Sequence, residues 1–196
     1  MTATTAAHGP RMVAAVLLVG FGFAGSAGAM SKAELRVAHE KAQGTYRSAW
    51  DACKPLQGNA KDVCKVEAQG QFDIAKAELQ AQFKPTPKHD DKVRTEKAVA
   101  AYRLAREKCG DLRGNGKDVC KKDAKAGYVA ATGEARLSRA DIADGLNSRK
   151  AMRERKDVRE DTADAQFAAA KERCDGLSGE AKPACVLDAK KKFGKP

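Results

Sequence analysis

Apolar side chains recur every three or four residues on both sides of each of three cysteine-bounded segments. In the first third of the chain, one such stripe precedes the segment and a second follows it: Leu35, Ala38, Ala42, Tyr46, Ala49, Cys53 and Leu56, then Ala60, Cys64, Ala68, Phe72, Ala75 and Leu79. This spacing places side chains on one face of an α-helix. After residue 29 the chain shows no alternation typical of β-strands. The pattern predicts an all-α fold in which each segment joins two helices.

The cysteine-bounded segment occurs three times, as CKPLQGNAKDVC at 53–64, CGDLRGNGKDVC at 109–120 and CDGLSGEAKPAC at 174–185. An aromatic residue lies seven positions before each first cysteine, and another lies eight positions after each second one: Tyr46, Tyr102 and Phe167, then Phe72, Tyr128 and Phe193. These are six of the eight aromatic residues after position 29, so we interpret them as structural. Each unit is expected to be one helical hairpin.

The turn residues agree with a hairpin. Gly58 and Gly114 suit the left-handed conformation that ends a helix, and the asparagine after each glycine is expected to cap the next helix. The third unit has Glu180 in place of the asparagine, with Pro183 two residues before its second cysteine. Since proline is tolerated only in the first helical turn, that helix is expected to begin near residue 181 or 182.

The six cysteines are expected to pair within each hairpin. Residues on either side of a tight turn face each other across two antiparallel helices, and alanines let the backbones approach to disulfide distance. The predicted bonds, one of 15 connectivities, are Cys53–Cys64, Cys109–Cys120 and Cys174–Cys185. Each closes about 12 residues and adds about 3 kcal/mol in the chain-entropy model. The fold class is therefore all-α, with three disulfide-stapled antiparallel helical hairpins arranged as a bundle or an elongated array.

The unit boundaries follow from breaks in the helical pattern. Pro85 and Pro87 mark a linker, and the third unit starts 65 residues after the second, against 56 for the first two. Ser148 is a candidate cap for a new helix that runs to about Cys174. We expect a signal peptide at 1–29, hairpin repeats at 31–84, 92–146 and 147–196, and a proline-containing linker at 85–91.

The N-terminal segment determines the expected compartment. The apolar run MVAAVLLVGFGFAG is followed by Ala27 and Ala29, which fit a signal peptidase site, so we expect cleavage after Ala29 and a periplasmic protein. The alternative is a retained N-terminal membrane anchor, because residues 12–29 approach the length of a membrane span. An exported chain with an even number of cysteines favours disulfides over metal ligands.

The net positive charge of the chain bears on which partners it can bind. The chain has 37 Lys and Arg against 26 Asp and Glu, and removal of residues 1–29 with their single arginine changes the net charge from +11 to +10. Such a balance favours anionic partners. The densest basic stretch supplies the candidate polyanion contacts Arg149, Lys150, Arg153, Arg155, Lys156 and Arg159. The favoured alternative is a solvated helix face with the ion pairs Lys150–Glu154, Arg153–Asp157 and Lys156–Glu160.

Other chemistry is sparse. Lys61, Lys117 and Lys182 share a repeat position and are expected to point to solvent, and Trp50 is expected to pack between helices. No GxSxG, phosphate loop or HExxH motif occurs, so we predict no enzyme, catalytic residue, cofactor, metal site or small-molecule substrate.

The repeated Cys-x10-Cys motif, with LxGxAK or LxGNxKDVC inside Ala/Lys/Glu-rich helices, resembles uncharacterised proteobacterial exported proteins that are often labelled by analogy with the TolA periplasmic stalk. The resemblance covers about residues 31–196 and implies a cell-envelope setting without assigning any functional residue. TolA-type proteins keep a membrane anchor and a distinct C-terminal domain, and this chain shows neither clearly.

The first functional hypothesis is a non-enzymatic periplasmic structural or interaction protein of the cell envelope, with an unidentified envelope protein or an anionic surface as partner. One alternative is a cationic protein that binds polyanions such as lipopolysaccharide or, less favoured, nucleic acid. The other is a periplasmic stress chaperone, which requires exposed apolar grooves.

Overall fold

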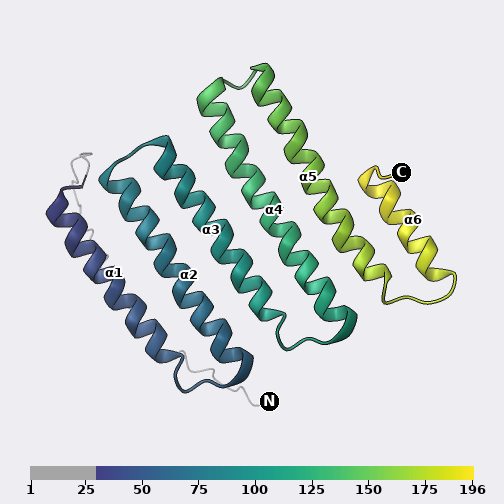
Figure 1. The fold of residues 1–196 in the computed structure, drawn as a ribbon, viewed down its shortest axis with the longest axis horizontal. Coiled ribbons are helices and arrows are strands. Elements are labelled where there is room, and N and C mark those ends of the chain that lie inside the picture. The colour runs from purple at the N-terminus through teal and green to yellow at the C-terminus, as the bar shows by residue number, and fades with distance from the viewer. Residues whose placement is uncertain (1–29) are drawn as a thin grey trace, which may run out of the picture.

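Six antiparallel helices lie side by side in a single row. A computed structural model describes residues 30–196, and these form α1 (Lys32–Ala52), α2 (Gly58–Phe83), α3 (Pro87–Lys108), α4 (Gly114–Asp144), α5 (Arg149–Cys174) and α6 (Ala181–Phe193). Each helix packs only against its neighbours along the chain, so the layer is one helix thick (Figure 1). Of the two predicted arrangements, the elongated array is the one observed. The expected signal peptide lies outside the described residues.

Side-chain caps fix the starts of α1, α3 and α5, and the cap at Ser148 is the one that the sequence predicted. Ser31 and Glu34 form a capping box on α1, and the Ser148 hydroxyl accepts a hydrogen bond from the Ala151 amide at the start of α5. The helix α6 begins at Ala181, as Pro183 requires. The linker is shorter than the predicted 85–91, because Thr86 caps α3 and Pro87 is its first residue, where proline loses no hydrogen bond.

The three predicted disulfides are present. Cys53–Cys64, Cys109–Cys120 and Cys174–Cys185 join α1 to α2, α3 to α4 and α5 to α6, with Cα–Cα distances of 5.6, 5.8 and 5.7 Å. The first cysteine of each pair is completely buried. The prediction that the turn asparagines cap their own helices is wrong, since α2 and α4 begin without a side-chain cap.

The interior is thin and built almost entirely from small residues. Within residues 30–196 the buried apolar side chains are alanines, with the three first cysteines and Val158. Helix α1 buries no residue at all. Because alanine removes little apolar area from water, each helix-helix seam contributes less burial energy than a leucine-lined seam would.

The extra residues between the second and third units lengthen one hairpin. Helices α2 and α4 begin at equivalent glycines, but α4 has 31 residues against 26 in α2. Helix α5 begins 25 residues before the first cysteine of its unit, against 22 residues for α3. The additional turns therefore lie at the α4–α5 connection, on the edge opposite the disulfides (Figure 1).

Candidate binding surface

The disulfide-stapled seams are open along one side. Between α1 and α2 lies an apolar groove of about 340 Å³, with a floor formed by Ala38, Ala42, Ala49, Ala68 and Ala75. Tyr46 and Phe72, the aromatic residues of the repeat, stack across it with ring centroids 4.9 Å apart. Alanine side chains are too short to fill the space that the disulfide and the aromatic pair hold open.

A second groove of about 650 Å³ lies between α3 and α4. Tyr102 and Tyr128 meet there at 4.8 Å, flanked by Ala98, Ala124 and Ala131. These residues occupy the same repeat positions as those of the first groove, so both grooves open on the same side of the layer. We call this side the grooved face.

Cations lie over the aromatic rings of this surface. Lys76 Nζ is 4.8 Å from the Phe72 ring centroid, and Lys125 Nζ is 5.0 Å from that of Tyr128. In the third hairpin, Lys192 Nζ lies 5.3 Å from the Phe193 ring centroid. Each hairpin thus combines an aromatic ring with an ammonium group, an arrangement that stabilises the cation and keeps the ring edge accessible.

The seams without disulfides are closed by close packing. A Cβ placed on Gly70 of α2 would lie 3.0 Å from the Ala100 Cβ of α3, and one on Gly133 of α4 would lie 2.7 Å from Val158 Cγ1 of α5. Both glycines are buried. The α2–α3 and α4–α5 backbones therefore approach each other more closely than alanine would allow without a shift.

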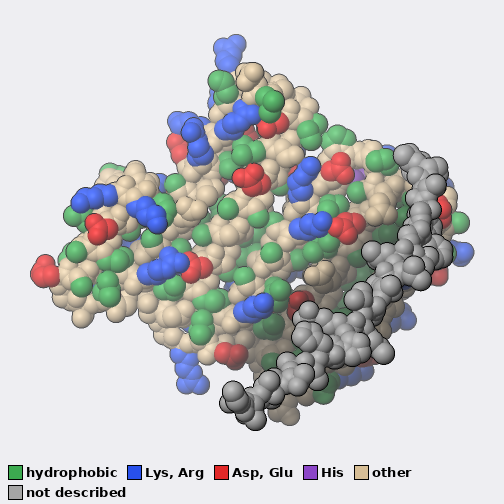
Figure 2. Space-filling view, turned by 180° about the vertical axis from the view of Figure 1, so that it is seen from behind, with side chains coloured by type: hydrophobic (Ala, Val, Ile, Leu, Met, Phe, Trp, Pro, Cys, Tyr) green, Lys and Arg blue, Asp and Glu red, His purple; other side chains and the backbone are tan. Residues whose placement is uncertain are grey.

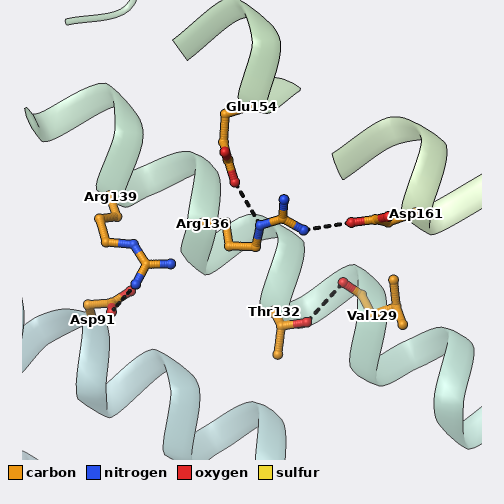
Figure 3. Close-up of polar contacts among 7 residues, drawn as sticks. All are labelled: Asp91, Val129, Thr132, Arg136, Arg139, Glu154 and Asp161. Carbon is orange, nitrogen blue, oxygen red and sulfur yellow. Dashed lines mark hydrogen bonds and ion pairs between the residues drawn. The ribbon is translucent and has the colours of Figure 1, made fainter. Parts of the chain in front are cut away.

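Ion pairs reinforce these closed seams. Arg136 of α4 donates to Glu154 Oε1 at 2.7 Å and to Asp161 Oδ2 at 2.6 Å, both on α5 (Figure 3). On the other side of α4, Arg139 donates to Asp91 of α3 at 3.2 Å, across the α3/α4 seam. The hydrogen bonds that Arg136 donates to Asp161 and Glu154 raise its pKa above the ordinary value. The arginines of α4 thus bind the helices on both of its sides.

Asp73 joins α2 to α3 in the same way. Its Oδ1 lies 2.8 Å from Lys76 Nζ, and its Oδ2 lies 3.8 Å from an Arg103 nitrogen of α3. Partial burial favours a raised pKa, but hydrogen bonds from Lys76 and Gln69 and the charges of Lys76 and Arg103 outweigh it, so the Asp73 pKa is lowered.

The turn asparagines link neighbouring hairpins instead of capping helices. Asn59 Nδ2 donates to Asp111 Oδ2 at 3.1 Å, and Asn115 Nδ2 donates to the Glu172 carbonyl at 2.8 Å. Gly110 leaves room for Asn59, because a Cβ there would overlap its side-chain amide. Each asparagine thereby sets the position of the next hairpin. The sequence of one repeat unit could not show this role, because the partner residue belongs to the following unit.

The repeated lysines do more than point to solvent. Lys61 and Lys117 donate to the carbonyls of Lys54 and Gly110 at 3.2 and 3.0 Å, across the turn that each disulfide closes. Lys182 pairs with the Asp175 carboxylate at 2.9 Å, and this hydrogen bond lowers the Asp175 pKa. The three lysines therefore close the disulfide turns, which corrects the prediction of a purely solvated role.

The basic stretch of α5 divides into three groups. Arg155 is tied to Asp141 and to the Leu146 carbonyl, both at 2.5 Å, and Lys150 pairs with Asp144 at 3.1 Å. Of the three predicted pairs only Lys156–Glu160 forms, at 3.7 Å, because Asp144 takes Lys150 and Arg136 takes Glu154. The third group is Arg149, Arg153 and Arg159, which are exposed and have no carboxylate partner among residues 30–196.

Basic side chains do not gather into one patch on the face seen in Figure 2, where Lys and Arg alternate with Asp and Glu. Trp50 lies 5.6 Å from Tyr46 of its own helix, between ring centroids, and its contact with the neighbouring helix is with Lys65 of α2, whose Nζ is 5.4 Å from the Trp50 ring centroid. In the part of the chain that the structure describes, no three His, Cys, Asp or Glu side chains are placed to hold a metal ion.

Three intramolecular disulfides indicate that the chain folds in an oxidising compartment. No helix within residues 30–196 combines the length and the apolar character needed to cross a membrane. Comparison of the chain with protein families, curated proteins and solved structures gave no match.

Proposed function

We propose that the chain is a non-enzymatic periplasmic interaction protein of the cell envelope, whose binding surface is the grooved face. The observation that carries this proposal is the pair of apolar grooves, repeated at equivalent positions on a layer one helix thick. A layer that no second layer covers leaves apolar surface available to a partner. The partner is an envelope protein that inserts apolar side chains between the helices of a hairpin.

The second candidate function is that of a periplasmic stress chaperone. It is favoured by the same grooves, because a chaperone needs exposed apolar surface for unfolded clients. The polyanion-binding alternative has less support, because cations beside the closed seams are paired with carboxylates. An anionic ligand would have to compete with those pairs.

The experiment is capture of partners from envelope extract by the oxidised protein at low and high salt. We expect one defined partner to remain bound at high salt, since apolar contacts are not screened. Ala42→Phe fills the first groove and should abolish capture, whereas Ala33→Phe, at an exposed position of α1, should not. Capture that disappears with salt, or that survives groove filling, would refute the proposal.

The chaperone alternative has its own readout. Suppression of aggregation of several unrelated unfolded proteins, lost on Ala42→Phe, would favour it over a dedicated partner. Cell fractionation of the full chain tests the compartment independently: protein with free thiols in the cytoplasm would exclude a periplasmic role.

A further inference from the structure

The α4–α5 connection is where the repeat is interrupted, and it projects from the layer. Helix α4 exceeds α2 by five residues, and α5 begins three residues farther from its first cysteine than α3 does, which lengthens this hairpin by about 5 to 8 Å at the helical rise of about 1.5 Å per residue. We call residues 139–153 the α4–α5 tip. Within it, Arg139 pairs with Asp91 of α3 and Asp141 pairs with Arg155 of α5.

The tip concentrates exposed apolar side chains. Ile142 at the end of α4, Leu146 in the turn and Met152 in the first turns of α5 are 56%, 61% and 54% exposed. Elsewhere in residues 30–196, exposed large apolar residues are isolated: one leucine in each disulfide turn, Val37 and Leu187. Single exposed residues need no explanation, but three within eleven residues on one projecting hairpin mark an interaction site.

The tip also carries surplus positive charge. Between Arg139 and Arg153 the chain has four basic residues and two acidic ones. Lys150 pairs with the Asp144 carboxylate, but the Lys150 side chain remains 77% exposed. Arg149 and Arg153 lie on the stripe of α5 that continues, by steps of three and four, to Phe167 and Cys174. Because α6 ends at Phe193, no helix within residues 30–196 covers that stripe near the tip.

We propose that the α4–α5 tip docks on the surface of an anionic phospholipid bilayer. Ile142, Leu146 and Met152 enter the interface between headgroups and acyl chains, where an apolar element sinks about 5 to 10 Å, close to the length by which the tip projects. Arg149, Lys150 and Arg153 contact lipid phosphates. A soluble polyanion would use the cations but would gain nothing from the apolar side chains, so their combination favours a membrane surface.

This docking goes beyond the proposed function and is independent of it. The tip lies on the edge opposite the disulfide turns, so the helices would stand away from the bilayer. The grooved face would then remain open to a partner while the protein is held at the membrane. Loss of one activity does not require loss of the other, because the tip and the grooves share no residue.

The test is sedimentation of the oxidised chain with phosphatidylcholine vesicles that contain or lack phosphatidylglycerol. We expect binding only to the anionic vesicles. Binding to the anionic vesicles should weaken about tenfold or more in each of two double variants, Leu146→Ser/Met152→Ser and Arg149→Glu/Arg153→Glu. For the charge variant this follows because each cation near an anionic surface contributes about 1 kcal/mol. All four positions are exposed or at the surface, and circular dichroism checks that the helices persist.

Matched controls separate docking from general charge attraction. Arg36→Glu/Arg47→Glu makes the same charge change on the exposed side of α1, and Leu112→Ser/Leu177→Ser removes two exposed leucines from the opposite edge. Both should change binding by less than about twofold. Equal losses in the tip and control charge variants, or no binding to either vesicle, would overturn the proposal.

Insertion has a direct readout as well. In a Trp50→Phe background, Leu146→Trp should shift its fluorescence to the blue on anionic vesicles, whereas Leu112→Trp should not. If Arg149→Glu/Arg153→Glu abolishes binding while Leu146→Ser/Met152→Ser leaves it intact and no blue shift occurs, the ligand is a soluble polyanion and the membrane proposal is wrong.

Discussion

The molecule contains two kinds of helix-helix seam, and they are held in different ways. The seams α1/α2, α3/α4 and α5/α6 each carry a disulfide, and the first two are open grooves lined by alanine and one aromatic pair. The seams α2/α3 and α4/α5 carry no disulfide but pack more extensively, with a buried glycine and interhelical ion pairs in each.

The difference shows that covalent bonds and packing substitute for each other along the same row. A disulfide near the turn holds two helices that share little buried area, which leaves part of their seam free as a groove. Where no disulfide is present, glycine lets the backbones approach until van der Waals contact and ion pairs suffice. The open seams can therefore serve as binding surface, whereas the closed seams give the layer its continuity.

The largest expected effect is the release of α1 when its disulfide is removed. Cys53→Ala/Cys64→Ala should destabilise the first hairpin by about 3 kcal/mol. Because α1 buries no residue, its amides should then exchange with solvent as in an unfolded segment. Hydrogen exchange with mass spectrometry measures this effect.

The matched change is Cys109→Ala/Cys120→Ala, which removes the same length of closed loop. Helices α3 and α4 should keep their protection better than α1 does, because closed seams with α2 and α5 hold them from outside. Equal loss of protection in α1 and in α3 would contradict the distinction between the two kinds of seam.

Two glycines of α4 test the seams on the same helix. Gly133 faces Val158 across a closed seam, while Gly127 lines the open groove and has no atom within 4 Å of an added Cβ. Gly133→Val should destabilise by about 1 to 3 kcal/mol through overpacking, since a valine side chain cannot rotate away. Gly127→Ala should stabilise by about 0.5 to 1 kcal/mol through helix propensity. Thermal unfolding measures both, and effects of the same sign would show that the seams do not differ.

The asparagine link between hairpins should be measurable as a coupling. Gly110→Ala places a methyl group against Asn59 and should cost about 1 kcal/mol, as the hydrogen bond to Asp111 is strained or lost. In an Asn59→Ala background the same substitution should cost much less. A double-mutant cycle by denaturant unfolding gives the interaction energy, and simple additivity of the two changes would mean that the contact does not set the position of the second hairpin.

The smallest expected effect is the acid sensitivity of the α2/α3 seam. The lowered pKa of Asp73 means that its carboxylate stabilises the fold above the pKa of the unfolded chain. That contribution is lost as the pH falls below about 4 and through the folded-state pKa. It should amount to less than about 1 kcal/mol. Asp73→Asn should reduce the acid-induced fall in melting temperature, and an unchanged pH profile would exclude this role.

The hairpins and the disulfides were predictable because both depend on local spacing. The three- and four-residue periodicity and the position of Pro183 act within a few residues, and the structure confirms both. The turn glycines Gly58 and Gly114 have the predicted positive φ, but they begin α2 and α4 and do not end the preceding helices, which stop at Cys53 and Cys109. The single-row arrangement was not determined by the same signals. Alanine stripes fit a bundle as well as a row, because alanine at a seam does not specify which partner it meets.

The candidate site was predictable only in part. Placement of the aromatic residues at fixed repeat positions indicated structural side chains, but not that they stack across an open groove. The partners of Arg136, Asn59 and Lys150 involve neighbouring hairpins or a turn, so pairing rules within one helix assigned two of the three α5 ion pairs wrongly. Glu154 pairs with Arg136 of α4 and Lys150 pairs with Asp144, so these contacts replace the Lys150–Glu154 pair expected from spacing along α5.

The single-layer design has a consequence for how the sequence can change over time. Within residues 30–196 only twelve apolar side chains are buried, so most positions experience little selection for packing. Mutational tolerance should be high across both faces of the row and low at the cysteines, the positive-φ turn glycines and the few seam residues. Such a chain can diverge until its relatives share little beyond the cysteine spacing, while its architecture persists.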